Sequence, residues 1–186
     1  MNRQEIERLF PIETTRLLLR LATLDDATLI QTAKESYADV LRRWMSWSSD
    51  ENMSLQGTID YLEMANSDEN TRCIAILVVD KETGAHVLST GLDGEDDDFQ
   101  IISTGWWLSA GHEGKGLAFE GMQGLINLCR QHAICQKIIS SYYEGNDRSQ
   151  KLMERLGFQH TNTKIKTHRC HLNGEMMDEI EYEMVI

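Results

Sequence analysis

The most informative segment of the sequence is Trp106-Trp107-Leu108-Ser109-Ala110-Gly111-His112-Glu113-Gly114-Lys115-Gly116-Leu117-Ala118. It begins as an apolar strand, passes through a turn that holds three glycines, and opens a helix with apolar residues at helical spacing. Glycine lets the backbone approach a ligand without a Cβ in the way. The first turn of a helix offers unpaired N–H groups at the positive end of its dipole. The stretch therefore predicts an anion site that suits a pyrophosphate.

Two better-known phosphate motifs are absent from the chain. Neither G-x-G-x-x-G nor G-x-x-x-x-G-K-[ST] occurs, so a dinucleotide-binding fold and a P-loop are both disfavoured. A short glycine-rich turn can also bind nothing, and Lys115 either adds charge to it or only lines its rim. The anion site therefore needs support from a second pattern.

That second pattern is Asn146-Asp147-Arg148-Ser149-Gln150-Lys151-Leu152-Met153-Glu154-Arg155-Leu156-Gly157-Phe158. It follows an expected strand at 137–143 and predicts a short helix that ends at Gly157, a typical residue just after a helix. Asn146 and Ser149 are both residue types that cap helix N-termini. Capping is compatible with ligand contact at the same helix end, so the two roles do not exclude each other.

The rest of the chain supplies further strands and helices around these segments. Strands are expected at residues 15–21, 72–80, 86–92, 99–108, 137–143, 159–168 and 176–185, and helices at 27–34, 37–44, 54–66, 116–131 and 147–156. Hairpins in the middle and at the end imply antiparallel pairs, and the crossover over 99–143 implies one parallel pair. The acidic run 93–98 lacks the ligand spacing of a calcium loop and predicts a solvated turn. The expected fold class is α+β, a mostly antiparallel sheet flanked by helices.

The two segments together resemble the GCN5-related N-acetyltransferase (GNAT) family. Gly114-Lys115-Gly116-Leu117-Ala118 matches its cofactor turn, and residues 146–158 match its second signature, N-x-x-S-x-x-x-x-E-[KR]-x-G-F, completely. The expected strand order agrees as well, so the resemblance covers nearly the whole chain. It implies one acetyl-CoA-binding N-acetyltransferase domain over 1–186, in which the parallel strand pair is splayed.

Within that family the chain is most similar to the RimJ/RimL branch, which acetylates protein N-termini. Three features carry this closer likeness: the start Glu13-Thr14-x-Arg16-Leu17-x-Leu19-Arg20, the loop that contains Trp44 and Trp47, and Leu172-Asn173-Gly174-x-x-x-Asp178 near the end. The branch implies an acceptor amine on a protein N-terminus, such as that of a ribosomal protein. Trp44 and Trp47 either line the acceptor cleft or pack in the core.

The resemblance also implies roles for individual residues. The pyrophosphate of acetyl-CoA is expected on the backbone amides of Gly114, Lys115, Gly116, Leu117 and Ala118. The pantetheine arm is expected to pair with the backbone of Trp107 and Leu108, where an amide would polarise the thioester carbonyl. Asn146 would bond the pantetheine, and Ser149 would donate a proton to the leaving thiolate.

Two departures from the family pattern leave the catalytic base open. Gly111 stands where the family prefers Gln or Arg, and Ser103 and Thr104 stand where many relatives carry a glutamate. Deprotonating an α-amine at pH 7 costs roughly 1 kcal/mol, against nearly 5 kcal/mol for a lysine, at about 1.36 kcal/mol per pKa unit. A chain without a strong base is therefore better matched to an N-terminal amine. Among the histidines, we expect His171 to be the catalytic residue.

Composition narrows the remaining function classes. A net charge of −12 argues against direct nucleic-acid binding and favours the approach of a cationic acceptor. The chain has no apolar run long enough to span a bilayer and no evident secretory signal, which predicts a cytoplasmic protein with no membrane partner. The four cysteines form no CxxC pair, so free thiols and no metal are expected. The oligomeric state stays open, with a homodimer as one alternative.

Two other functions remain as alternatives to a protein N-terminal acetyltransferase. One is a small-molecule acetyltransferase for a polyamine or a drug, which the acidic charge suits. The other is a non-catalytic acetyl-CoA-binding domain, which the missing glutamate would suit. The loop with Trp44 and Trp47 favours the protein acceptor over the small amine.

Overall fold

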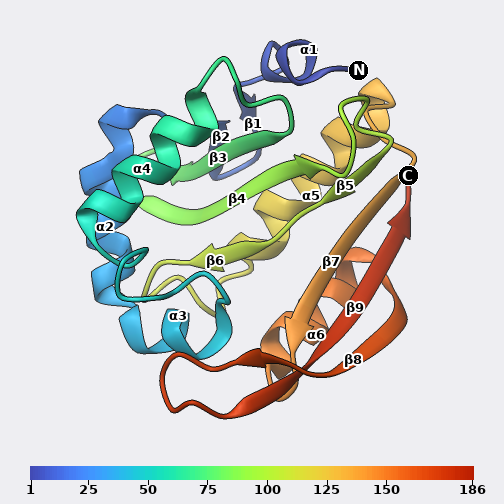
Figure 1. Cartoon of the computed structure of the whole chain (residues 1–186). Coiled ribbons are helices and arrows are strands. Elements are labelled where there is room, and N and C mark those ends of the chain that lie inside the picture. Colours follow the sequence, from blue (N-terminus) through green and yellow to red (C-terminus); the bar gives the residue numbers. More distant parts are fainter.

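The computed structural model describes all residues, 1–186, and shows a nine-stranded sheet with helices on both faces (Figure 1). The strand order is β1-β2-β3-β4-β5-β7-β9-β8, with β6 paired to β4 beside β5. Every pairing is antiparallel except that of β5 with β7. The expected fold class, a mostly antiparallel α+β sheet with one parallel pair, is confirmed.

Most elements lie within a few residues of the ranges that the sequence predicts. The strands are β1 (Ile12–Glu13), β2 (Leu17–Leu21), β3 (Cys73–Asp80), β4 (His86–Gly94), β5 (Ile101–Ser103), β6 (Trp106–Leu108), β7 (Lys137–Tyr143), β8 (Gln159–Arg169) and β9 (Met176–Val185). The α-helices are α1 (Arg3–Glu7), α2 (Ala27–Ser36), α3 (Ala38–Trp44), α4 (Leu55–Asn66), α5 (Leu117–His132) and α6 (Asp147–Leu156). The sequence did not predict α1 or β1. No helix is long and apolar enough to cross a membrane.

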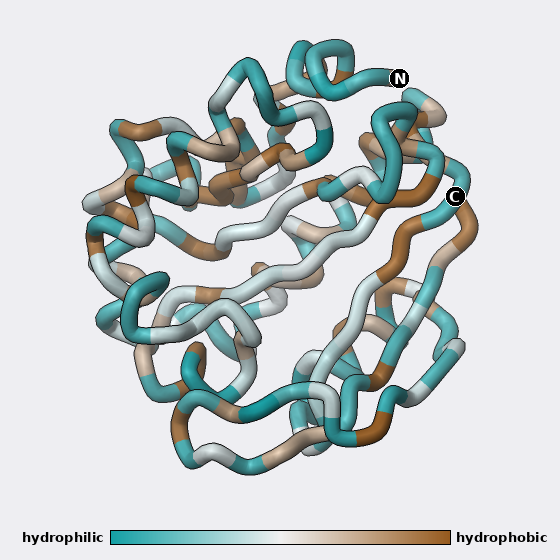
Figure 2. The backbone as a smooth tube through the Cα atoms, viewed as in Figure 1, coloured by the Kyte–Doolittle hydropathy of each residue, from teal (hydrophilic) through white to brown (hydrophobic).

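Each face of the sheet has its own hydrophobic core. The larger core lies under α5 and α6 and includes Leu88, Met122 and Phe158. The smaller core lies under α2, α3 and α4 and includes Leu62, Leu77 and Trp107. In Figure 1, α2 and α4 lie at one side of the sheet and α5 passes behind it. The turn between β4 and β5 is mostly hydrophilic (Figure 2), but its Phe99 is fully buried in the larger core.

The single strand expected at residues 99–108 is wrong, because the chain breaks it at Thr104 and Gly105 into β5 and β6. Side-chain hydroxyls satisfy the backbone at this break. Thr104 Oγ1 donates to the Gly91 carbonyl, Thr90 Oγ1 to the Gly105 carbonyl and Ser140 Oγ to the Thr104 carbonyl, each at 2.7 Å. Since buried backbone groups need partners, these bonds hold the break open without leaving orphaned carbonyls.

Candidate active site

The break turns the parallel pair into a V-shaped opening. β5 runs parallel to β7 as far as the pair Ser103–Ile139, and the Thr104 amide still donates to the Ile139 carbonyl at 3.0 Å. Beyond Gly105, β6 pairs only with β4, while β7 pairs only with β9. The two strands therefore diverge, as Figure 1 shows for β6 and β7. The facing edges of both strands are free to bind something else.

The direction of the free backbone groups on β6 follows from its pairing with β4. The Ser109 amide donates to the Val87 carbonyl at 3.0 Å, which makes that pair a hydrogen-bonded one. In an antiparallel ladder such pairs alternate, so the backbone of Trp107 also points to β4. The amides and carbonyls of Trp106 and Leu108 point the other way, into the opening. The backbone pairing expected at Trp107 is therefore wrong, because that backbone is bonded to β4, and Trp106 takes its place beside Leu108.

The β6 strand leads into the glycine turn, which is built for close backbone approach. Gly111, Gly114 and Gly116 have φ values of +80°, +72° and +74°, a region that residues with a Cβ rarely adopt. A Cβ added to Gly111 or Gly114 would meet no atom within 4 Å, so the space above the turn is open. Gly116 is the N-cap of α5 and provides no capping side chain, which leaves the first amides of the helix unpaired.

Charged side chains fix the position of this turn. Arg16 on the segment before β2 donates to the Lys115 carbonyl at 3.1 Å and forms an ion pair with Glu120 on α5 at 2.6 Å. On the other side of the turn, a hydrogen bond from Tyr37 holds the pKa of Glu113 below its usual range, with Arg148 of α6 adding to the effect. The turn is thus fixed to the segment before β2, while Tyr37 and Arg148 favour the charged form of Glu113.

The helix on the opposite side of the opening, α6, begins as the sequence predicts. The Asn146 side chain accepts from the Ser149 amide at 3.3 Å and caps the helix, which ends at Gly157 with φ +97°. The capping alternative is therefore correct for Asn146. Its amide nitrogen and the Ser149 hydroxyl form no hydrogen bond within the protein, and both residues line the cleft described next.

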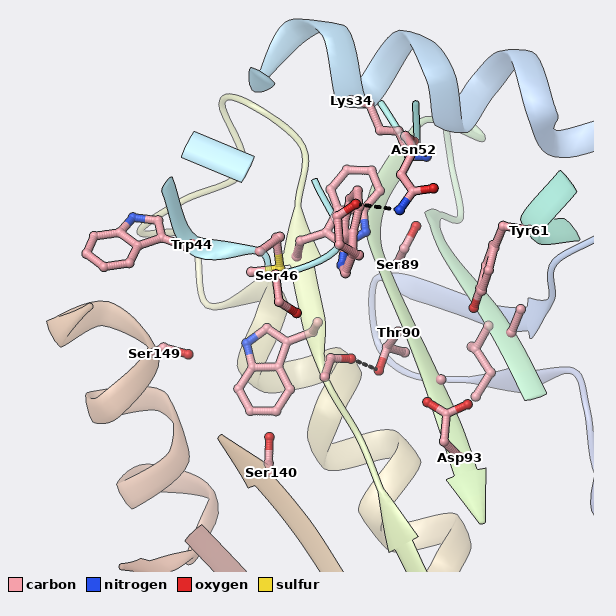
Figure 3. A pocket seen from close by; sticks show the side chains of 18 of the residues that line it. Lys34, Trp44, Ser46, Asn52, Tyr61, Ser89, Thr90, Asp93, Ser140 and Ser149 are labelled. Carbon is pink, nitrogen blue, oxygen red and sulfur yellow. Dashed lines mark hydrogen bonds between the residues drawn. The ribbon is translucent and has the colours of Figure 1, made fainter. Parts of the chain in front are cut away.

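A cleft of about 440 Å³ extends from the opening to the helices on the front face. That volume is within the range of small-ligand sites. Its walls come from α2, α4, β3, β4, β6, β7 and α6, so it joins the two halves of the sheet. Figure 3 shows Ser149 on one side of it, Asp93 on the other and Ser140 between them.

Trp44 and Trp47 both line this cleft, and their contact with an acceptor stays a prediction. Trp47 packs at 6.3 Å from the Trp107 ring, in the smaller core. Trp44 lies nearer the rim, under the Arg43 guanidinium at 4.8 Å, with its ring 3.7 Å from where a Cβ on Gly145 would be. The two tryptophans therefore form part of the cleft wall and also pack against other side chains.

Lys34 is a cleft residue that the sequence reasoning missed. Its ammonium donates to Thr58 Oγ1 at 2.8 Å and to the Asn52 carbonyl at 3.0 Å, and it lies 5.2 Å from the Trp47 ring. No carboxylate pairs with it, and burial lowers its pKa to about 8. An amphipathic helix pattern gives no signal for such a residue, because one lysine among polar residues is expected to face solvent.

The histidines of the C-terminal hairpin are brought together, but differently from the expectation. His171 is exposed, and its Nε2 lies 2.8 Å from the Ser46 carbonyl, which bridges the hairpin to the tryptophan loop. To make that bond Nε2 must carry a proton, so only Nδ1 could act as a base. His168 is buried against the Tyr143 ring at 3.9 Å, and its Nε2 has no partner. The catalytic role of His171 stays a prediction.

A third histidine, His86, is buried beside the cleft between two serine hydroxyls. His86 lies between the hydroxyls of Ser109 and Ser89, with Nε2 2.8 Å from Ser89 Oγ, and it stacks on Trp107. Burial lowers its pKa to about 4, so it is neutral at pH 7. It therefore supports Ser89, a lining residue, and the first residue of the glycine turn from behind.

The chain is similar in sequence and fold to known acetyltransferases. The uncharacterized N-acetyltransferase YjdG of Bacillus subtilis (strain 168) is 27% identical over 150 residues, 79% of this chain and 88% of that protein. The ribosomal-protein-S5-alanine acetyltransferase of Vibrio fischeri superposes with a TM-score of 0.81 at 20% identity, over 95% of this chain and 96% of that one. RimL, a ribosomal L7/L12 alpha-N-protein acetyltransferase solved in complex with coenzyme A, gives a TM-score of 0.82 at 15% identity, over 93% and 96%.

At these identities the two superpositions establish a common fold, and the expected likeness to the RimJ/RimL branch is confirmed at that level. The sequence itself matches the family model of the acetyltransferase (GNAT) domain over residues 16–159. That match includes the opening between β6 and β7, the glycine turn and the whole of α6. The chain therefore belongs to the GNAT family of acetyltransferases.

Proposed function

We propose that this GNAT enzyme transfers the acetyl group of acetyl-CoA to an amine, and that its preferred acceptor is the α-amine of a protein N-terminus. The observation that carries the proposal is the V-shaped opening that ends at the glycine turn. A free strand edge, an open turn and an uncapped helix start follow one another over residues 106–117. This combination suits a long ligand with a pyrophosphate in its middle.

The residues around the opening fit such a cosubstrate. The amides of Gly114–Ala118 would hold the pyrophosphate, because the turn is open where a Cβ would block it. Backbone groups of Trp106 and Leu108 would pair with the pantetheine arm, while Trp107 would contribute through its ring in the cleft wall. An amide of β6 would polarise the thioester carbonyl. Asn146 and Ser149 would meet the arm from the other side, with Ser149 as the proton donor to the leaving thiolate.

An N-terminal α-amine is favoured as the acceptor for two reasons. Its ordinary pKa, about 7.7–8.0, makes the neutral form accessible near pH 7, which suits a site without the glutamate usual in the family. The solved relatives RimL and the Vibrio enzyme act on ribosomal proteins, which supports a protein acceptor for a chain with their fold. The cleft volume also suits a small amine, so a polyamine or drug acceptor is the second candidate.

Thiol release from acetyl-CoA, measured over a panel of acceptors, tests the proposal. The panel holds peptides that begin with each of the twenty residues, the same peptides with acetylated N-termini, and spermidine. We expect release with a subset of the free peptides and none with their blocked forms. Release with spermidine alone would establish the small-amine alternative.

Binding is measured separately from transfer. Acetyl-CoA at a hundredfold excess over its Kd should stabilise the protein by about 2.7 kcal/mol, which appears as a higher melting temperature. A shift without any thiol release would indicate a non-catalytic acetyl-CoA-binding domain. If millimolar acetyl-CoA produces no shift in melting temperature and no thiol is released, the proposed function is overturned.

A further inference from the structure

Part of the cleft wall is backbone without side chains, next to the point where the chain leaves β7 after β5 and continues as β6. Asp93 pairs with Ser103, and Thr90 pairs with Trp106, in one continuous register. Gly91 therefore lies opposite Gly105, and both line the cleft. A Cβ added to Gly105 would meet no atom within 4 Å, whereas one on Gly91 would lie 3.0 Å from the Ile74 carbonyl oxygen. A molecule in the cleft can therefore reach the sheet at Gly105, next to the break between β5 and β6.

Asp93 flanks this bare patch and leans over it. It lies two residues from Gly91 on β4, so the two residues share one face of the sheet. Its Oδ2 is 4.0 Å from the position that a Cβ on Gly91 would take. In Figure 3 its carboxylate points from β4 into the cleft, below Tyr61 of α4.

The surroundings of Asp93 leave its charge uncompensated. None of the eight ion pairs in the molecule includes it. Its side-chain partner is the Cys73 thiol, and the Tyr61 hydroxyl oxygen lies 3.9 Å from the Cys73 sulfur. Burial raises the pKa of the Asp93 carboxyl. Asp93 and Tyr61 nevertheless retain accessible surface, which is consistent with side chains on a concave wall.

The cleft offers no other carboxylate. Asp93 is the single acidic residue among those that line it. On the neighbouring strand β9, Glu183 pairs with Lys137 and Glu181 with Lys164. Glu179 accepts hydrogen bonds from Ser141 and Thr167. A group that carries a positive charge into the cleft therefore has one anionic partner there.

We propose that Asp93 is the residue that binds the acceptor's ammonium group and accepts its proton, in place of the glutamate missing at Ser103 and Thr104. This assignment rests on the proposed function, because it needs an amine acceptor. An ammonium over Gly91 and Gly105 would form an ion pair with the Asp93 carboxylate beside the splay point. Partial burial raises the pKa of the Asp93 carboxyl, which makes the carboxylate a stronger base than one in water.

The chemical step balances with the groups named. Asp93 takes one proton from the ammonium, and the neutral amine forms a C–N bond with the acetyl carbon as the C–S bond breaks. The nitrogen then loses a second proton, and the thiolate gains one from Ser149, whose hydroxyl is restored by that second proton. Asp93 releases its own proton to solvent. The sum is an amide, a thiol and one proton from an ammonium and a thioester.

The test compares Asp93→Asn with Asp98→Asn, which removes the same charge from the exposed turn outside the cleft. Peptides from the panel, free and N-acetylated, are titrated by calorimetry onto each protein saturated with CoA, which cannot react. We expect wild type and Asp98→Asn to prefer free termini at least tenfold, and Asp93→Asn to lose that preference while it binds CoA normally. In turnover we expect kcat/KM to fall about 10²-fold or more in Asp93→Asn, the usual contribution of a general base, with partial recovery in Asp93→Glu.

The outcomes separate this assignment from the proposed function. Equal preference for free and blocked peptides in wild type, or an unchanged preference in Asp93→Asn, would overturn the role of Asp93. Acetyl transfer by wild type with unchanged kcat/KM in Asp93→Asn would overturn it too, and would leave the proposed function intact. Folding is checked by melting temperature. Because the raised pKa means that the ionised carboxylate is unfavourable in the folded state, Asp93→Asn should melt at the same temperature as wild type or higher at pH 7.

Discussion

Lys34 and Asp93 are the only charged residues that line the cleft, and neither has a partner of opposite charge. Burying a charge without a counterion is costly, so the buried Lys34 lowers the stability of the fold when it is ionised. Their positions on facing walls give the cleft one cationic and one anionic point. Such residues are typical of sites where function, rather than stability, selects the side chain.

Lys34 makes a prediction about stability and pH. Its folded pKa, about 8, lies below its ordinary value, 10.5. Between these pH values the unfolded chain holds a proton that the folded chain has lost, so this residue makes stability rise with pH. The rise should be at most about 3 kcal/mol. Urea unfolding of wild type and Lys34→Met at pH 7.5 and 10 measures it, with the exposed Lys151→Met as control. Equal pH dependence in wild type and Lys34→Met would contradict the prediction.

Ser149 makes a prediction about rate. Its hydroxyl forms no hydrogen bond in the protein, while the cap of α6 is supplied by Asn146. Ser149→Ala should therefore keep its stability and lose kcat, by about 10²-fold or less, because a thiolate is already a fair leaving group. Asn146→Ala should instead lose about 1 kcal/mol of stability with the cap. Steady-state kinetics paired with denaturation curves decide, and wild-type kcat in a folded Ser149→Ala would end the proton-donor role.

At the scale of elements, the glycine turn is held in shape by φ values that only glycine adopts easily. The hairpin turn between β3 and β4 contains a matching residue, Gly84, with φ +70° and nothing within 4 Å of its Cβ position. Gly114 has φ +72° and equally open space. The two glycines therefore share the same backbone strain on substitution and differ only in what the proposed function places above them.

Gly114→Ala and Gly84→Ala form a matched pair of variants. Each should lose about 1–2 kcal/mol of stability, because a Cβ disfavours the left-handed region. Only Gly114→Ala should also weaken acetyl-CoA binding, by about ten- to a hundredfold, since hydrogen bonds to a charged group contribute about 1.5–3 kcal/mol each. Calorimetry with CoA measures the difference. Equal affinity in both variants would show that the turn does not hold the pyrophosphate.

The elements also show what the sequence could and could not predict. α5, α6 and β9 were predictable because caps, glycines and hydrophobic periodicity agree locally. The break between β5 and β6 was not, because it depends on hydroxyls of Thr90 and Ser140 that come from other strands. Asp93 was missed for a similar reason. It begins a run of acidic residues that indicates a solvated turn, yet it is still part of β4 and faces the cleft.

At the scale of the whole molecule, the cleft exists because two half-sheets meet only along β5 and β7. Each half has its own helices. Under the proposed function, the cleft between the two halves binds the cosubstrate from one side and the acceptor from the other. At the edge of the cleft, the contact of His171 with the Ser46 carbonyl joins the C-terminal hairpin to the tryptophan loop. The net charge of −12 creates a negative electrostatic field around the molecule, and this field acts at longer range than any contact.

That charge predicts how salt changes the choice of acceptor. Two peptides with the same N-terminal residues, one with a lysine-rich tail and one with a glutamate-rich tail, present the same amine to the cleft. The negative field should raise kcat/KM for the basic peptide and lower it for the acidic one, and salt screens such a field within about 10 Å at 0.1 M. Between 0.02 and 0.3 M salt we expect the ratio of the two kcat/KM values to fall about tenfold or more, since steering changes association rates by about 10–10³. The salt dependence measured with acetyl-CoA alone serves as the reference. An identical salt response for both peptides, relative to that reference, would show that the charge serves solubility and does not select the acceptor.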